Sequence, residues 1–123
     1  MYEDIIQQAM AEMVAGYEKI IERYLEEKDF AVFNTEIKEE SVRLGASIVK
    51  KVIEEINRML RDSRERRAKG WYVVKDDRRT ILTSLGNVCF ERTLFINHNT
   101  NERAYLADRM LHLAPGERMS EDA

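Results

Sequence analysis

Residues 35–60, TEIKEESVRLGASIVKKVIEEINRML, decide the fold of this chain. A line of mostly apolar residues recurs through them at steps of three and four: Ile37, Ser41, Leu44, Ile48, Val52, Ile56 and Met59. This spacing predicts one apolar face of a long α-helix. Asn34-Thr35 is a favourable N-cap site and Gly70 a C-terminal stop, so we expect this helix to run from Thr35 to about Lys69. At 1.5 Å per residue it would be roughly 50 Å long.

The residues before this helix carry an earlier apolar stripe with the same period. Its members are Ile5, Ile6, Ala9, Met10, Met13, Val14, Tyr17, Ile20, Ile21, Tyr24 and Leu25. Residues 1–69 therefore predict a two-helix αα-hairpin. A hairpin alone buries a thin core, and the stripe of residues 37–59 is close to heptad spacing, so we expect oligomerisation, most simply a two-fold dimer that forms a helical bundle. An alternative stays open, in which both stripes pack only on the C-terminal sheet.

Residues 70–113 have the composition of a small sheet, with β-branched and aromatic runs separated by turn residues. We expect four short antiparallel strands at residues 71–74, 80–83, 88–96 and 102–106. Asp76-Asp77 and Leu85-Gly86-Asn87 are the predicted turns, and residues 97–101 a polar hairpin loop. A helical turn or two follows in residues 108–113. The predicted class is α+β, a long αα-hairpin followed by a small antiparallel β-meander in one compact domain.

Composition excludes several classes of protein. A chain of 123 residues, 44% hydrophobic and 35% charged, fits one folded domain. No uninterrupted apolar run exceeds four residues, and the start Met1-Tyr2-Glu3-Asp4 carries two acidic side chains and no basic one, so we expect neither a membrane span nor a secretory signal. The single cysteine, Cys89, excludes a disulfide framework and fits the reducing cytoplasm, where we expect the protein to lie.

Residues suited to catalysis are scattered along the sequence. His98 lies in a predicted loop, His112 near the chain end and Cys89 on a predicted strand, so a metal site would need three unrelated segments to converge. No Gly-rich phosphate-binding motif is present either. We therefore expect two surface histidines and a small buried thiol. The sequence predicts no catalytic residue, no metal, no cofactor and no small-molecule substrate.

Net charge conceals a partition along the chain. Residues 1–57 hold 7 basic and 13 acidic side chains, residues 58–79 hold 9 and 4, and residues 80–123 hold 4 and 6. The overall charge of −3 is therefore an average over −6, +5 and −2. A basic segment of this kind carries information that the total does not.

The basic segment is the candidate binding site, and we expect it to contact nucleic-acid phosphates. The residues proposed for this role are Arg61, Arg64, Arg66, Arg67, Lys69, Lys75, Arg78 and Arg79. Trp71 and Tyr72 lie between the two groups of cations and would brace the strand or stack. Two alternatives stay open: a solvated face, whose cations offset the negative end of the helix dipole, and a site for an acidic protein partner.

Several short blocks of the second half resemble the N-terminal region of ISLre-type bacterial insertion-sequence transposases, a group long catalogued as an uncharacterised family. The blocks that carry the resemblance are residues 70–83 (GWYVVKDDRRTILT), 85–88, 92–95, 105–108 and 115–119. The likeness covers residues 70–123 well, whereas the helical half is similar only in style.

This resemblance implies a DNA transposase that uses acidic residues and divalent metal in a catalytic region C-terminal to this segment. No acidic residue of this chain matches that catalytic pattern, so the implied role of these residues is accessory: DNA contact, dimerisation or both. Related-looking transposases place a metal-binding Cys cluster near such a hairpin, but residues 97–101 contain no cysteine, so we expect no zinc. Residues 114–123 are expected to begin a linker or helix that leads into the absent region. The alternative function is a protein-interaction or oligomerisation module without nucleic-acid contact.

Overall fold

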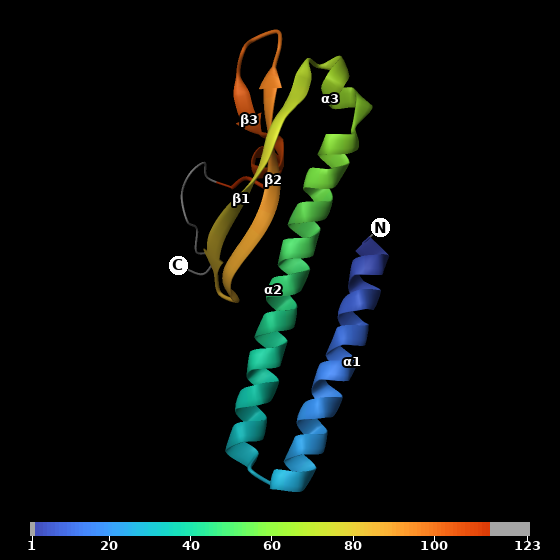
Figure 1. The fold of residues 1–123 in the computed structure, drawn as a ribbon, viewed down its shortest axis with the longest axis vertical. Coiled ribbons are helices and arrows are strands. Elements are labelled where there is room, and N and C mark those ends of the chain that lie inside the picture. The colour runs from blue at the N-terminus through green and yellow to red at the C-terminus, as the bar shows by residue number, and fades with distance from the viewer. Residues whose placement is uncertain (1, 114–123) are drawn as a thin grey trace. The chain divides into compact units, whose positions relative to one another are not determined.

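The structure is a computed structural model that describes residues 2–113 of the chain. Seven elements follow one another: α1 (Tyr2–Glu27), α2 (Phe30–Asp62), α3 (Arg64–Ala68), β1 (Trp71–Thr83), β2 (Gly86–Asn97), β3 (Arg103–Tyr105) and α4 (Leu106–Met110). Figure 1 shows the long helices first and the antiparallel strands after them. The predicted α+β class is confirmed. The linker or helix expected at residues 114–123 lies outside the described residues.

The chain divides into two compact units, Met1–Val49 and Lys50–Ala123. We call the first the hairpin unit and the second the sheet unit. Helix α2 belongs to both, since the division falls within it. That the chain folds as one domain stays a prediction.

The hairpin unit joins α1 to α2 through a tight bend at Lys28 and Asp29. Lys28 adopts a positive φ of 56°, and the Asp29 carboxylate accepts a hydrogen bond from the Val32 amide at 3.2 Å. Asp29 thus serves as the N-cap of α2, which begins five residues before the predicted start at Thr35. The prediction of a cap at Asn34-Thr35 was wrong because Asp29 caps the helix first. The rings of Tyr24 and Phe33 stack across the bend with centroids 4.5 Å apart.

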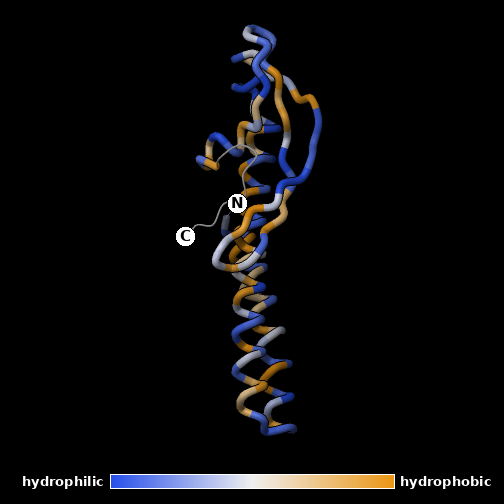
Figure 2. The backbone as a smooth tube through the Cα atoms, turned by 90° about the vertical axis from the view of Figure 1, so that its left-hand side faces the viewer, coloured by the Kyte–Doolittle hydropathy of each residue, from blue (hydrophilic) through white to orange (hydrophobic). Residues whose placement is uncertain are grey.

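One side of this hairpin is charged. Arg23 pairs with Glu36 at 2.6 Å, and Glu40 pairs with Arg43 within α2. Gly16 allows α1 to approach α2 here, because a Cβ at this position would lie 2.6 Å from Oε1 of Glu40. Figure 2 shows hydrophobic and hydrophilic residues alternating along the helices.

The second long helix ends at Asp62, not at Lys69 as predicted, and the short helix α3 follows. Ser63 makes the break: its hydroxyl caps α3 by accepting from the Arg66 amide at 3.4 Å. Gly70 then ends α3 with a φ of 93°, and its amide donates to the Arg67 carbonyl at 3.0 Å. The predicted glycine stop is therefore confirmed, although it ends a separate helix.

The sheet has three strands in the order β1-β2-β3, and both pairings are antiparallel. The two strands expected at residues 71–74 and 80–83 form one strand of 13 residues, interrupted only by an irregularity between Val73 and Lys75. Asp76-Asp77, predicted as a turn, lies in its middle. This prediction was wrong because both aspartates find cationic partners inside the fold, which removes the preference for a turn.

The core of the sheet unit lies on both faces of β2. Val88 and Phe90 are buried on one face, and Thr93 and Phe95 are buried on the other. Asn57 of α2 holds the second face: its side chain donates to Thr93 Oγ1 and accepts from the Thr93 amide, both at 3.0 Å. Ala104 of β3 and Ala107 of α4 complete the core.

Candidate nucleic-acid interface

The basic segment of residues 58–79 is spread over the end of α2, the whole of α3 and most of β1. Its cations fall into three groups by environment. Two are buried, five are paired with carboxylates at the surface, and two on α3 are exposed with no carboxylate partner within residues 2–113. Only cations that reach solvent can contact a phosphate directly.

Arg66 is buried, with an exposed fraction of 7%. Its guanidinium donates to three main-chain carbonyls: to Leu60 at 3.1 Å, to Arg61 at 2.7 Å and to Trp71 at 2.9 Å. It also lies over the Phe95 ring, 5.3 Å from the centroid. Burial lowers the pKa of Arg66 from its ordinary value, and the neighbouring arginines act in the same direction. Arg66 thus joins carbonyls at the end of α2 to the start of β1, so it is a structural anchor and not a free phosphate ligand.

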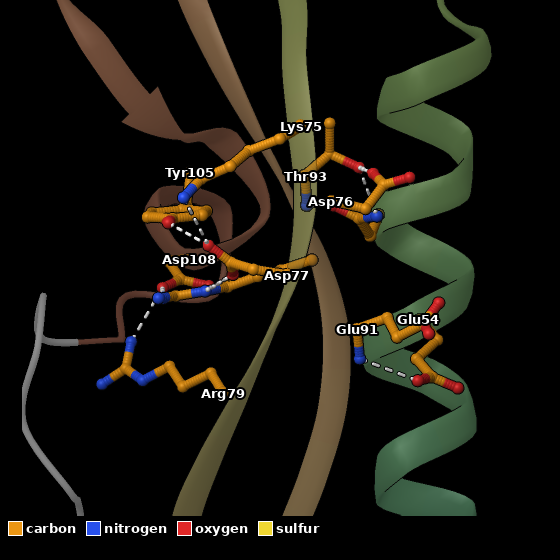
Figure 3. Close-up of polar contacts among 11 residues, drawn as sticks. Glu54, Lys75, Asp76, Asp77, Arg79, Glu91, Thr93, Tyr105 and Asp108 are labelled. Carbon is orange, nitrogen blue, oxygen red and sulfur yellow. Dashed lines mark hydrogen bonds and ion pairs between the residues drawn. The ribbon is translucent and has the colours of Figure 1, made fainter.

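Arg79 is also buried, and its Nη1 donates to Asp108 Oδ2 at 2.8 Å. The same oxygen accepts from Arg92 of β2 at 2.5 Å, so one carboxylate of α4 joins β1 and β2. Figure 3 shows Arg79, Asp108, Asp77 and Tyr105 converging beside the sheet. Asp108 Oδ1 is buried without a hydrogen-bond partner among the described residues. The structure therefore removes Arg79, like Arg66, from the set of phosphate contacts expected from the sequence, because a buried ion pair holds it.

Asp77 belongs to the same cluster. Burial, the largest single influence, opposes its ionisation, but the Tyr105 hydroxyl and the Arg92 guanidinium donate to its carboxylate and outweigh that effect. The pKa of Asp77 is therefore held below its ordinary value of 3.8. Arg92 lies over the Tyr105 ring, with its carbon 3.6 Å from the centroid. This cluster fixes α4 on the sheet.

Five surface cations of the segment each lie near a carboxylate. Arg58 pairs with Asp62 at 3.0 Å, Arg61 with Asp76 at 2.5 Å, Lys69 with Glu65 at 3.1 Å, Lys75 with Asp77 at 4.0 Å and Arg78 with Glu91 at 3.8 Å. Exposed pairs of this kind contribute only about 0–1 kcal/mol. Such cations can exchange a carboxylate for a phosphate at small cost, but in the free chain their charge is largely compensated.

Arg64 and Arg67 differ from the rest. Both are exposed on α3, and neither guanidinium group has a hydrogen bond or ion pair within residues 2–113. The main-chain carbonyl of Arg67 accepts from the Gly70 amide. The two residues are three positions apart, so they share one side of the helical turn. They are the cations that the structure leaves available.

An aromatic pair lies close to the end of α3. The rings of Tyr72 and His98 stack with centroids 4.3 Å apart and planes 16° from parallel, and both residues are exposed. The loop that carries His98 is fixed to the end of α3, since the His98 amide donates to the Gly70 carbonyl at 2.8 Å and Asn97 donates to the Lys69 carbonyl at 3.2 Å. We call Arg64, Arg67, Lys69, Tyr72 and His98 the α3 patch.

The sequence pattern did not place His98 at this site. Only the register of the β1–β2 pair, in which Tyr72 lies opposite Ile96, brings the loop back to the end of α3. The prediction that both histidines are exposed is confirmed, whereas Cys89, expected to be buried, is exposed. Cys89 alternates with the buried Val88 and Phe90 along β2, which places it on the opposite face.

Two further observations concern the described residues only. Within residues 2–113, no group of three or more His, Cys, Asp or Glu side chains has a geometry that could hold a metal ion. No helix in that part of the chain is both long and apolar enough to cross a membrane.

Similar proteins occur in Caldanaerobacter subterraneus subsp. tengcongensis. A UPF0236 protein of Caldanaerobacter subterraneus subsp. tengcongensis, whose name joins eleven locus designations beginning with TTE0033, is 27% identical over 122 residues, 98% of this chain and 26% of that protein. Two other UPF0236 proteins of the same organism, TTE2489 and TTE0610/TTE0881/TTE1053/TTE2432, are each 29% identical over 85 residues, 69% of this chain and 18% of theirs. The chain thus spans about a quarter or less of the length of these relatives. No solved structure matches it.

A family model matches residues 25–123, from the end of α1 onwards. The match includes α2, α3, the whole sheet and α4, and therefore both the α3 patch and the Asp77–Asp108 cluster. On this evidence the chain belongs to the uncharacterised protein family UPF0236.

Proposed function

We propose that this chain is the N-terminal accessory module of an insertion-sequence transposase and that it contacts DNA through the α3 patch. The observation that carries the first part is the naming of the relatives. One protein name joins eleven loci of a single genome, and another joins four. A coding sequence that copies itself to new sites leaves such a multiplicity, whereas an ordinary enzyme gene is present once or a few times. The resemblance of residues 70–119 to ISLre-type transposases points the same way.

The DNA contact rests on Arg64 and Arg67. Two exposed guanidinium groups without carboxylate partners attract phosphates more strongly than the paired cations around them do. Lys69, whose pair with Glu65 is exposed on both sides, can join them. The local excess of positive charge in residues 58–79 gives the approaching DNA a favourable field despite the overall −3.

Because the contacts proposed are to phosphates, binding should be independent of sequence and strongly dependent on salt. Each phosphate that a cation neutralises contributes a slope of about −0.9 to the plot of log affinity against log salt. No hydrogen bond to a base edge is proposed. Stacking of an unpaired base on the exposed Tyr72–His98 pair would add to affinity for DNA with open ends.

The test is fluorescence anisotropy of a labelled duplex titrated with the full chain at several salt concentrations. The double variant Arg64→Glu/Arg67→Glu should bind more weakly and reduce the slope by about 2, with the same effect on unrelated duplex sequences. The matched control is Lys19→Glu/Lys38→Glu, which changes the net charge equally at two exposed positions of the hairpin unit.

Equal weakening by both double variants would mean that net charge, not the α3 patch, governs binding. The complete absence of salt-dependent affinity would reject DNA contact and leave the protein-interaction role.

A further inference from the structure

Tyr72 and His98 form a stacked pair of rings at the surface of the sheet unit. Their centroids lie 4.3 Å apart and their planes are inclined by 16°, so the two rings are nearly parallel. Tyr72 keeps an exposed fraction of 42%, and His98 is exposed as well. A stacked pair on a sheet also stabilises the segments that carry it, so its exposure alone does not identify a ligand. The surroundings of the pair do.

The loop between β2 and β3 holds the His98 ring in place before any ligand binds. The His98 amide donates to the Gly70 carbonyl at 2.8 Å. Asn97, buried at the end of β2, donates to the Lys69 carbonyl at 3.2 Å and accepts from the Asn99 amide at 2.9 Å. The loop packs so closely that a Cβ on Gly70 would lie 2.6 Å from Nδ2 of Asn99. Because the ring pair is fixed in this way, little further ordering is needed when a ligand stacks on it.

The same hydrogen bonds join the ring pair to the cationic end of α3. The two carbonyls that bind the loop, those of Lys69 and Gly70, immediately follow this helix. Arg64 and Arg67 are exposed on α3, and their guanidinium groups have no carboxylate partner within residues 2–113. Glu65, the one acidic residue of α3, is paired with Lys69 at 3.1 Å. Flat rings next to available cations are the combination with which proteins bind single-stranded nucleic acids.

We propose that the Tyr72–His98 pair stacks on an unpaired base of DNA while the cations of α3 contact phosphates of the same strand. This inference rests on the proposed function and names the class of DNA that the α3 patch prefers, a duplex that carries a single-stranded tail. Bases inside a duplex have both faces covered by their neighbours, so only a terminal or unpaired base offers a free face. Stacking is tolerant of sequence because every base has a flat aromatic face.

The cations favour a nucleotide over an aromatic side chain of a protein partner. A nucleotide carries a flat ring and a phosphate on one sugar, so it matches both the ring pair and the guanidinium groups of Arg64 and Arg67. An aromatic side chain of a partner would occupy the rings and leave those two cations without a counter-charge. The ring pair and the cations therefore point to one ligand that contains both groups.

The test compares the affinity of the full chain for DNA ligands that share one labelled duplex, measured by fluorescence anisotropy at a fixed salt concentration. One ligand has blunt ends, one carries a short tail of thymidines, and one carries the same tail built from abasic sites. The abasic tail keeps the phosphates and lacks the bases, so the difference in affinity between the two tails measures base stacking. The thymidine tail should bind about tenfold more tightly than the abasic tail.

Variants of Tyr72 assign this difference to the ring pair. Tyr72→Ala should remove most of the difference between the two tails, whereas Tyr72→Phe should keep it because a phenyl ring retains the flat face. The matched control is Tyr2→Ala, the same substitution at a residue of 46% exposure in the hairpin unit, which should leave the difference unchanged. Circular dichroism of each variant confirms that the fold persists.

Equal affinity of the wild-type chain for the two tails would overturn the inference without the need for any variant. If the blunt duplex still bound with a strong dependence on salt, the proposed phosphate contact would stand and only the stacking site would be lost. A difference between the tails that Tyr72→Ala leaves intact, or that Tyr72→Phe or Tyr2→Ala removes as well, would also overturn it. The absence of binding to all of these ligands would reject the inference together with DNA contact itself.

Discussion

Arg66 and Arg67 are the same residue type at adjacent positions, yet their environments differ completely. Arg66 is buried and donates to the carbonyls of Leu60, Arg61 and Trp71, whereas Arg67 is exposed and its side chain has no ion pair in the described part of the chain. The sequence shows both as cations of one basic run. The two residues differ because the helix breaks at Ser63, which places the Arg66 side chain among main-chain carbonyls and leaves the Arg67 side chain in solvent. The apolar period of the sequence does not predict that break.

We therefore expect Arg66→Ala to lower the free energy of unfolding by about 3 kcal/mol, because it leaves buried carbonyls without donors. Arg67→Ala should change it by less than about 0.5 kcal/mol. Urea denaturation, followed by the fluorescence of the single tryptophan Trp71, measures both. Arg66→Lys should not rescue stability, since an ammonium group cannot reproduce the planar set of donors. Equal effects at the two positions would show that Arg66 is not an anchor.

Asp77 gives a prediction about acid stability. Its pKa is held below 3.8 in the folded chain despite the opposing effect of burial, so the unfolded chain binds its proton first as the pH falls. The stability that Asp77 contributes is complete above about pH 4 and is lost as the pH falls below that value. In Asp77→Asn the free energy of unfolding should be lower at neutral pH and should fall less steeply in acid. Tyr105→Phe, which removes one of the two donors to Asp77, should give an intermediate slope.

At the scale of elements, the long periodic helices were predicted from sequence, and their ends were not. The apolar stripe of α2 predicted that the helix exists, but the helix starts at Phe30 after the cap Asp29 and ends at Asp62 before the break at Ser63. These ends differ from the prediction because a cap depends on which side chain reaches the backbone. Strand β1 departs further from the prediction, because a predicted turn lies inside it. Asp76 accepts from Arg61 and from Thr93, which lies opposite it on β2, so a dipeptide typical of turns remains extended (Figure 3). The extended conformation of Asp76 therefore depends on hydrogen bonds to residues 15 and 17 positions away in the sequence, which local propensity does not include.

Two glycines of similar conformation allow the junction between α3 and β1 to be tested. Gly70 has a φ of 93° and Gly86 a φ of 98°. A Cβ on Gly70 would lie 2.6 Å from Nδ2 of Asn99, whereas a Cβ on Gly86 would meet nothing within 4 Å. Gly86→Ala should therefore cost only backbone strain, about 1 kcal/mol, and Gly70→Ala about 2 kcal/mol, because it also displaces the loop that carries His98. Chemical denaturation of the two variants checks the difference, and equal losses would mean that the loop does not pack on Gly70.

At the scale of the whole molecule, the sequence predicted self-association but not the surface responsible. Both stripes appeared equally available, and the stripe of α2 was the one with apparent heptad spacing. The structure buries Leu44 and Ile53 of α2, while Met10, Val14 and Leu25 of α1 stay exposed. The sequence could not reveal this because the choice depends on how the two helices turn toward each other around Gly16 and Tyr17.

The two units offer separate probes for a final prediction, which rests on the self-association of the hairpin that the sequence predicts. Trp71 lies in the sheet unit, so its fluorescence reports the unfolding of that unit. Far-ultraviolet circular dichroism reports mainly the helices, and α1 and the first part of α2 lie in the hairpin unit. Because dimerisation stabilises only the folded hairpin, a tenfold rise in chain concentration should raise the midpoint of the helical melt. The midpoint seen by Trp71 should remain unchanged. In Met10→Glu the helical melt should lose its dependence on concentration, while Met110→Glu should keep it. If both probes moved together, the units would unfold as one, and if neither moved, α1 would not pair.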